Sequence, residues 1–237
     1  MLEFFAAVSA SVCIAPSASF AAESWGGSLA ATSDYLVRGI SRSDHDPAVQ
    51  TDLHIAFDSG LIGGLFASTT RIASEEHRDV ELSAFVGFVW AQRDPWRVRV
   101  MASHYTYPWN DEGSKYNYDE LSIDAAYRDW LDINLVYSPN IPRYQPETGL
   151  IGVAETSVDI NFHTPWLHRF AATAGVGLAD VGGPDGTNYL YWSAGGVYDR
   201  APWSFSVSYV GTNSAAQYLF YNAAAHSRLT ATVIWQY

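Results

Sequence analysis

The sequence predicts an all-β fold, a transmembrane antiparallel up-and-down β-barrel of about twelve strands, and three observations support this prediction. Segments of roughly 8 to 13 residues alternate between apolar and polar side chains, close to the length that a tilted membrane strand needs. The connections between these segments alternate between short and long. The 237 residues combine 15% aromatic with only 16% charged residues, and a single β domain can reach this size.

The N-terminal residues predict a secretory signal peptide rather than a strand. An apolar run leads to the small residues Ser19 and Ala21, which suit a cleavage site. Glu3 stands where a positive charge is expected, which puts the true start codon in question. The predicted organisation is a signal peptide at 1–21, cleaved during export through the periplasm, followed by one barrel at 22–237.

The predicted strands follow one another without a linker. In the segment near 78–91, Val80 and Leu82 alternate with Asp79 and Glu81, and this period of two marks a strand with one apolar face. The mean hydropathy of −0.06 argues against helical membrane spans. The predicted strands lie near 27–37, 48–57, 60–69, 78–91, 96–107, 117–128, 130–138, 151–163, 167–178, 188–198, 202–211 and 228–237.

The C-terminal strand allows two folds. Counting back from Tyr237 by twos places Trp235 and Val233 on one apolar face. A soluble β-sandwich would bury this face against a second sheet, whereas a membrane barrel turns it to lipid and places Trp and Tyr at the water interface. In the barrel, this strand would pair antiparallel with the strand near 27–37. The predicted aromatic girdle consists of Trp90, Trp96, Trp203, Trp235 and Tyr237.

The polar faces of the segments favour the barrel. The polar face of a sandwich meets bulk water and carries Lys and Glu freely, but these faces carry Asp, Glu and Arg among Ser, Thr, Asn and Gly. This composition is typical of a barrel lumen, where opposite charges pair across neighbouring strands. The predicted pore-lining residues are Asp34, Arg38, Asp52, Asp79, Glu81, Arg97, Arg99, Glu120, Asp124, Asp132, Glu155, Asp159, Arg169 and Arg228.

The connections give a second, independent signal, because short turns on one side and long loops on the other are typical of outer-membrane barrels. Both chain ends then lie on the short-turn side. The short connections lie at 58–60, 92–95, 128–129, 163–166 and 198–201. The long connections lie near 38–47, 70–77, 108–116, 139–150, 179–187 and 212–226.

Two interpretations of the lumen charges stay open. Asp34 and Arg38 are expected on the inner face of the first strand, either as a charged pair at the pore mouth or, the favoured role, as a structural salt bridge. The inward acids outnumber the inward arginines, which favours cations in a water-filled lumen. The same charges would instead block a narrow lumen if they pair across it.

The segment from Thr32 to Ser43, TSDYLVRGISRS, resembles the N-terminal signature of the TorF family of proposed porins. In that family a T-S-D-Y-x-x-R-G-x-S block precedes a P-A-x-Q block, which is similar to Pro47 to Gln50 here. The sharp motifs are confined to about residues 30–69, and the rest of the mature chain shares the hairpin rhythm. The resemblance implies an outer-membrane barrel of a Gram-negative bacterium with a pore role.

These observations favour an outer-membrane porin for passive diffusion of small hydrophilic solutes or ions, with a preference for cations. The alternatives are a closed structural or loop-presenting barrel without transport and, well behind, a lipid-modifying barrel enzyme. The expected partners are outer-membrane lipid and the barrel assembly machinery, which would recognise the C-terminal strand. The chain has 13 basic and 25 acidic residues, which argues against nucleic acid as a partner.

Candidate catalytic and metal-binding groups are few. His104 and Thr106 share a face near an upper strand end, but the sequence shows no acid beside them, so we expect no enzymatic activity and no catalytic residue. The clusters Asp44-His45-Asp46 and Glu75-Glu76-His77 could supply ligands to a cation. We interpret them as solvated loop charge, with no metal and no cofactor.

Overall fold

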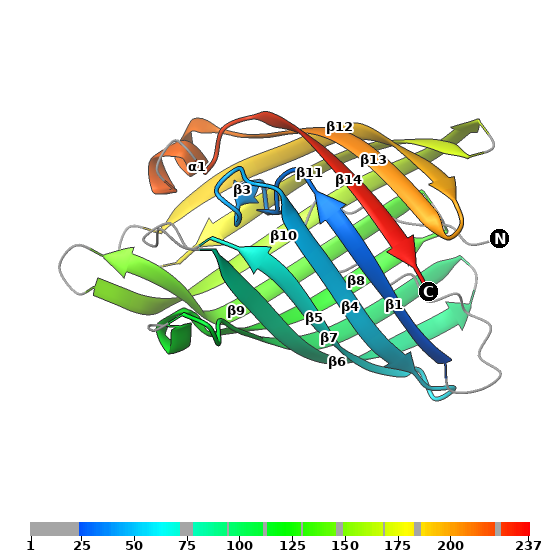
Figure 1. Cartoon of the computed structure of the whole chain (residues 1–237), viewed down its shortest axis with the longest axis horizontal. Coiled ribbons are helices and arrows are strands. Elements are labelled where there is room, and N and C mark those ends of the chain that lie inside the picture. Colours follow the sequence, from blue (N-terminus) through cyan, green and yellow to red (C-terminus); the bar gives the residue numbers. More distant parts are fainter. Residues whose placement is uncertain are drawn as a thin grey trace.

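The computed structural model describes residues 24–71, 78–93, 95–110, 113–128, 130–145, 149–167, 169–182, 186–220 and 224–237. This part of the chain forms a closed antiparallel barrel of twelve strands (Figure 1). Each strand pairs with the preceding and the following barrel strand. The predicted signal peptide lies outside the described residues. The barrel strands are β1 (Ser24–Thr32), β4 (Ala48–Ala56), β5 (Leu61–Thr70), β6 (Asp79–Arg93), β7 (Trp96–Thr106), β8 (Tyr118–Tyr127), β9 (Leu131–Gln145), β10 (Gly149–Leu167), β11 (Phe170–Val181), β12 (Thr187–Arg200), β13 (Trp203–Thr212) and β14 (Arg228–Gln236).

The first and last barrel strands close the ring, as the sequence predicts. β14 pairs antiparallel with β1, with Ser28 opposite Gln236 and Thr32 opposite Thr232. The backbone amides of Gly27 and Tyr237 each donate a hydrogen bond to the carbonyl oxygen of the other residue, at 3.2 and 3.1 Å. In Figure 1 the red β14 lies beside the blue β1. Closure leaves no unpaired strand edge along the barrel wall.

The alternation of side chains separates an exposed outer face from a buried lumen. Along β6, Glu81 is fully buried inside the barrel, and Ser83 and Phe85 follow it on the same face. Val86 and Trp90 belong to the opposite face and are 54% and 51% exposed. Because successive side chains of a strand point to opposite faces, one register places Asp79, Glu81 and Ser83 all inward.

Aromatic side chains gather on the outer face near the short-turn end. Trp90, Trp96, Trp203, Trp235 and Tyr237 are all exposed there. Neighbouring rings contact one another in three groups, so this aromatic belt consists of ring clusters rather than isolated positions. The ring pairs, with their centroid distances, are Phe88 and Trp90 (4.8 Å), Trp96 and Tyr127 (4.9 Å), Tyr127 and Trp130 (5.5 Å), Trp203 and Trp235 (6.5 Å), and Trp235 and Tyr237 (5.0 Å).

Two regions differ from the predicted element bounds. The first strand ends at Thr32 instead of continuing to residue 37, because the Thr32 hydroxyl donates to the carbonyl of Asp34 and the chain turns. The long loop expected at 139–150 is mostly strand, since β9 and β10 continue as a paired hairpin beyond the neighbouring strands. Ile141 and Val153 give this extension a buried face against Tyr107 and Tyr118.

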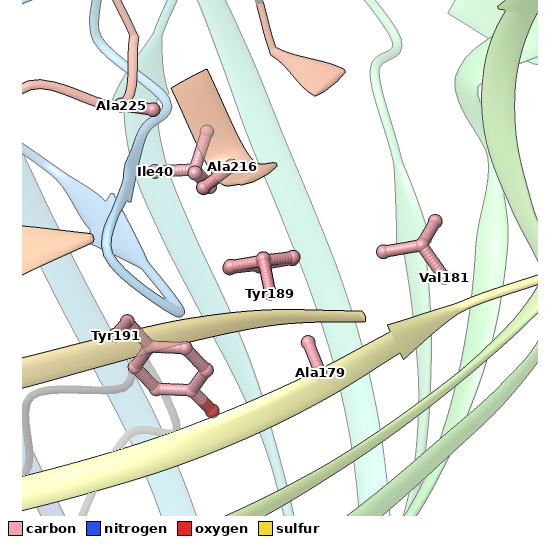
Figure 2. Packing of buried hydrophobic residues seen from close by; sticks show 7 residues of the cluster. All are labelled: Ile40, Ala179, Val181, Tyr189, Tyr191, Ala216 and Ala225. Carbon is pink, nitrogen blue, oxygen red and sulfur yellow. The ribbon is translucent and has the colours of Figure 1, made fainter. Parts of the chain in front are cut away.

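The loops at the long-loop end carry two short helical turns, at Gly113–Tyr116 and in α1 (Ser214–Leu219). Asn213 caps α1 by accepting a hydrogen bond from the backbone amide of Ala216. Figure 2 shows Ala216 packed with Ile40 and Tyr189 in a buried apolar cluster at this end of the lumen. In the described part of the chain, no helix is long and apolar enough to cross a membrane.

Candidate functional site in the barrel lumen

Residues 33–47 fold into the lumen and form what we call the lumenal hairpin. Its two short strands, β2 (Leu36–Val37) and β3 (Ile40–Ser41), pair antiparallel. The turn between them has two residues with positive φ, Arg38 at 51° and Gly39 at 79°. Two positive φ values in succession are the requirement of a tight two-residue hairpin turn, and glycine meets that requirement at little cost.

The tip of the lumenal hairpin is anchored by charge. The Arg38 guanidinium donates to Glu120 of β8 and to Glu155 of β10, each at 2.5 Å, and the arginine is 5% exposed. Burial alone would lower the pKa of Arg38, but the two carboxylates outweigh it and raise the pKa well above its ordinary value. The hairpin, which follows β1, is therefore bound to β8 and β10, two strands that are distant from it in sequence.

The tip also touches a third part of the wall. A Cβ atom added at Gly39 would lie 2.8 Å from Cγ2 of Thr212 and 2.9 Å from Cβ of Tyr191. Only a residue without a side chain fits this approach to β12 and β13. Ile40, next along the chain, packs against Tyr189 and Tyr191 (Figure 2). Together these contacts place the hairpin across the lumen.

Tyrosine hydroxyls and a second arginine fill the space between the hairpin and β6. Glu81 accepts hydrogen bonds from Tyr35 of the hairpin at 2.7 Å and from Tyr107 at 2.5 Å. Burial, and after it the charge of Glu81, raises the pKa of Tyr35 well above its ordinary value, so its hydroxyl remains a donor. The guanidinium of Arg42 lies 5.8 Å from the centre of the Tyr118 ring.

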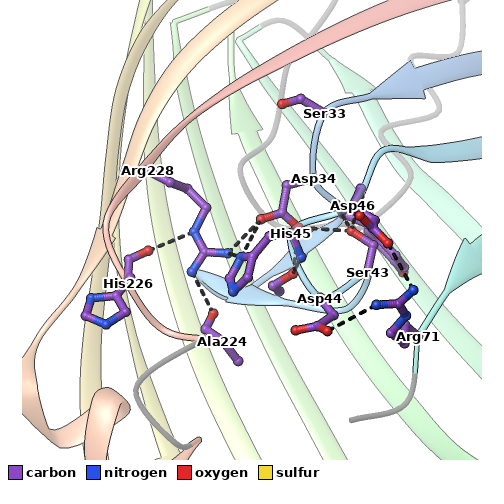
Figure 3. A network of polar contacts seen from close by, with 12 residues as sticks. Ser33, Asp34, Ser43, Asp44, His45, Asp46, Arg71, Ala224, His226 and Arg228 are labelled. Atoms are coloured by element: carbon purple, nitrogen blue, oxygen red, sulfur yellow. Dashed lines mark hydrogen bonds and ion pairs between the residues drawn. The ribbon is translucent and has the colours of Figure 1, made fainter. Parts of the chain in front are cut away.

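The base of the hairpin is tied to the last strand. Arg228 of β14 donates to Asp34 at 2.6 Å, and Ser41 and Ser43 donate to the same carboxylate. Figure 3 shows His45 beside this pair, with a ring nitrogen in contact with the Arg228 guanidinium. The backbone amide of Ser41 donates to the carbonyl of Ala224 at 3.0 Å, which joins the loop after β13 to the hairpin.

Further charged and polar pairs lie closer to the short-turn end. Arg99 of β7 faces Asp124 of β8 at 3.6 Å, and both are buried. Asp52 lies 2.8 Å from Nδ1 of His54 and also accepts from the Ser28 hydroxyl. The pairs of Arg99 with Asp124 and of Ser28 with Asp52 join neighbouring strands, as expected on the inner face of a barrel, whereas Asp52 and His54 share β4.

Most of the residues predicted to line the lumen lie on the inner face of the wall, though whether they line an open pore stays a prediction. The structure corrects three placements. Asp34 and Arg38 belong to the lumenal hairpin rather than to the first strand, because that strand ends at Thr32. Arg169 is exposed in the turn before β11, outside the lumen wall. The inward wall residues are Asp52, Asp79, Glu81, Arg97, Arg99, Glu120, Asp124, Asp132, Glu155, Asp159 and Arg228.

Of the two candidate cation clusters, the structure describes the one at 44–46. Asp44 and Asp46 pair with Arg71 at 3.4 and 3.1 Å, and Arg78 approaches Asp46 at 3.4 Å (Figure 3 shows Arg71). The cluster at 75–77 lies outside the described residues. Within the described ranges, no three His, Cys, Asp or Glu side chains are placed to hold a metal ion.

The sequence missed an acidic partner of His104 on the outer face. Nδ1 of His104 lies 2.8 Å from Asp119, and Asn140 donates to the same carboxylate at 3.0 Å. His104 and Asp119 stand directly opposite each other in the pairing of β7 with β8. Only the register between these strands could have revealed the pair, since 14 other residues separate the two in sequence.

The sequence also missed the tyrosines around Glu81. The predicted strand near 27–37 includes Tyr35, which the structure places in the lumenal hairpin, and the predicted strands near 96–107 and 117–128 have Tyr107 and Tyr118 at or next to their ends. The one available signal was the Arg38-Gly39 pair, because glycine after a charged residue suits a tight turn and interrupts a strand.

The architecture defines a class. The chain has the fold of porin barrels, as two solved structures illustrate. The NanC porin matches 89% of this chain and 98% of its own, with 11% sequence identity and a TM-score of 0.55. The KdgM porin, solved in complex with disordered oligogalacturonate, matches 90% of this chain and 98% of its own, with 12% identity and a TM-score of 0.51.

Within that class, the chain belongs to the Gcw_chp family, which is described as bacterial protein of unknown function and whose model matches residues 17–236. No curated protein sequence matches the chain. These matches carry nothing specific to the TorF family, so that resemblance stays an interpretation of the sequence.

Proposed function

We propose that the protein is an outer-membrane channel for passive diffusion of small hydrophilic solutes, with the lumenal hairpin as its constriction. The observation that carries the proposal is the partial exposure of polar side chains on the inner face between the hairpin and the short-turn end. Ser206, Thr232 and Ser122 point inward there and are only half-buried. A lumen filled throughout by side chains would bury these groups, so water reaches this part of the interior.

The proposed location is the outer membrane of a Gram-negative bacterium, reached through the periplasm. The apolar outer face supports this location because it can contact lipid tails. The aromatic belt at one end supports it because Trp and Tyr side chains favour the membrane–water interface. β14 closes the barrel against β1, and Trp235 and Tyr237 belong to this belt, which suits recognition of this strand by the barrel assembly machinery.

We further propose that the channel prefers cations. The inner wall carries more carboxylates than guanidinium groups, with Asp52, Asp79, Glu81, Glu120, Asp124, Asp132, Glu155 and Asp159 against Arg97, Arg99 and Arg228 among the described residues. Glu81 accepts from two tyrosines, and Asp159 accepts from Tyr191 at 2.5 Å. Carboxylates lining a water-filled lumen attract cations and repel anions. An anionic sugar chain such as the oligogalacturonate present with the KdgM porin would therefore meet an unfavourable field here.

Planar-bilayer recording of the refolded protein tests the channel. We expect stepwise currents in KCl and, under a salt gradient, a reversal potential of the sign that cation preference gives. Stepwise currents with the opposite sign would remove the cation preference and leave the channel. Absence of current steps in several salts, from protein shown to be folded, would overturn the proposed function.

The closed structural barrel is the second candidate, and the position of the lumenal hairpin favours it. The hairpin tip is held by three walls, and Tyr35, Arg38 and Ile40 are nearly fully buried. A variant that releases the tip separates the two candidates. If Arg38→Ala conducts and the wild type does not, the native protein is a closed barrel.

A further inference from the structure

We propose that the solutes are neutral and polyhydroxylated, that is, sugars or polyols, and that they pass along one side of the lumen lined by hydroxyl side chains. This inference rests on the proposed channel function. We call the side in question the hydroxyl strip and define it by six half-buried hydroxyl and amide side chains on the inner face of β13, β14, β1 and β4. Its members are Ser206, Ser208, Thr230, Thr232, Ser28 and Gln50.

The four strands of the strip are neighbours in the barrel, and four of its members form two cross-strand pairs. Ser206 stands opposite Thr232, and Ser208 opposite Thr230, in the pairing of β13 with β14. Thr232 stands opposite Thr32 in the pairing of β14 with β1, and the two hydroxyls are hydrogen-bonded at 2.9 Å. All six members of the strip are half-buried rather than buried, so they border accessible space inside the barrel.

The strip is also electrically neutral along most of its length. β1 and β13 contain no charged residue, and the only charge in β14 is Arg228 at its first position. Of the inward wall carboxylates, Asp52 lies on β4 beside the strip and accepts from Ser28, and the others lie on other strands; they are largely withdrawn from solvent. Asp52, Glu81 and Glu155 are 4%, 0% and 5% exposed. A solute in the accessible space thus touches hydroxyl groups more than charges.

Hydroxyl and amide side chains match a polyhydroxylated solute chemically. Each hydroxyl donates one hydrogen bond and can accept two, so a serine or threonine that already donates still accepts from a sugar hydroxyl. Thr230, for example, donates to the Ser208 carbonyl oxygen at 3.2 Å and keeps acceptor capacity. Successive weak sites of this kind replace part of the hydration of the solute without holding it, which is the condition for passage.

Several side chains on the strip are smaller than those on much of the opposite side. The wall from β6 to β10 carries Glu81, Phe85, Arg99 and Glu155 toward the interior, and the hairpin tip packs against it. Serine and threonine occupy the corresponding positions of β13 and β14. The strip therefore offers hydrogen-bonding groups on small side chains to a neutral solute.

Liposome swelling with the full-length mature protein tests the inference, with arabinose as the probe and KCl conductance measured in parallel. The first variant, Thr230→Val with Thr232→Val, removes two hydroxyls at nearly constant volume. We expect arabinose uptake to fall roughly two- to tenfold, the factor that corresponds to one hydrogen bond of ordinary strength, while KCl conductance stays at the wild-type level.

A matched pair of substitutions controls for position. Ser208 of β13 and Ser122 of β8 are both inward and half-buried, and each lies four residues from the long-loop end of its strand. We expect Ser208→Leu to slow arabinose uptake several-fold more than Ser122→Leu. Heat-modifiable migration on electrophoresis checks that each variant forms the barrel.

The outcomes separate the inference from the function on which it rests. Wild-type KCl conductance without arabinose uptake overturns the neutral-solute inference and leaves the channel standing. Equal arabinose uptake by wild type, the double valine variant and Ser208→Leu also overturns it. A wild type that neither conducts nor swells overturns the channel, and the inference with it.

Discussion

The two sides of the lumen differ in what their polar residues do. On the side from β6 to β10, carboxylates are buried and bound to the lumenal hairpin, most clearly Glu120 and Glu155 at Arg38 and Glu81 at Tyr35. On the side of β13, β14 and β1, hydroxyl groups are half-buried and line accessible space. The number of charges on an inner face therefore does not describe the surface that a solute meets, because paired and buried charges mainly hold the structure.

The largest expected effect comes from removing the anchor of the charged side. Arg38→Ala leaves Glu120 and Glu155 buried without their partner, and we expect the free energy of unfolding to fall by about 3 to 5 kcal/mol. Conductance should rise, since the hairpin tip is released. Urea unfolding in lipid vesicles, followed by tryptophan fluorescence, measures the first effect.

Arg78→Ala is the control for this substitution. Its guanidinium pairs with Asp46 at 3.4 Å but is 57% exposed, so we expect a change below about 1 kcal/mol. Equal effects of the two substitutions would show that the hairpin tip is not held by its buried ion pairs.

The second effect concerns the contact of the hairpin with the wall at β12 and β13. Gly39→Val adds a β-branched side chain at positive φ, against Thr212 and Tyr191, and we expect a loss of about 3 kcal/mol from strain and overpacking together. Gly149→Val is the matched control, since Gly149 has φ 76° and no atom within 4 Å of an added Cβ. Gly149→Val should therefore lose only the free energy of backbone strain at positive φ, roughly 1 to 2 kcal/mol. Identical losses in the two variants would argue against a tight contact at Gly39.

A smaller effect is expected from Tyr35→Phe, which removes one of the two hydroxyls that bind Glu81. Hydrogen bonds to charged groups contribute more than neutral ones, so we expect a loss of about 2 kcal/mol. Tyr209→Phe serves as the comparison, because Tyr209 is on the outer face and 51% exposed. If Tyr35→Phe lowers the free energy of unfolding no more than Tyr209→Phe does, the hydrogen bond from Tyr35 to Glu81 does not stabilise the fold.

The smallest expected effect belongs to the hydroxyl strip. Ser206→Ala removes a half-buried hydroxyl, and we expect the free energy of unfolding to change by no more than about 0.5 kcal/mol. A loss as large as that of Tyr35→Phe would remove the contrast between the two sides, because the strip would then be structural as well.

Much of the fold could be predicted because its signals are local. The alternation of Val80 and Leu82 with Asp79 and Glu81 follows from the period of a strand, and the register of β6 confirms which residues point inward. The pairing of the last strand with the first could be predicted because the alternation of short and long connections places the start of the first strand and the end of the last strand on the short-turn side. The extension of β9 and β10 could not, since its buried face depends on tyrosines from other strands.

The sequence by itself determined the barrel, its closure by β14 and the polar character of its interior, because a period of two and the turn lengths specify them along the chain. Only the tertiary structure decided which polar groups of that interior pair with one another and which remain accessible. Arg38 meets Glu120 and Glu155 across 82 and 117 residues of chain, and Arg228 meets Asp34 across 194. No local pattern encodes such contacts, which arise when the closed wall brings distant strands around the folded hairpin. The same closure separates buried charges from accessible hydroxyls, and with them the proposed path of the solute.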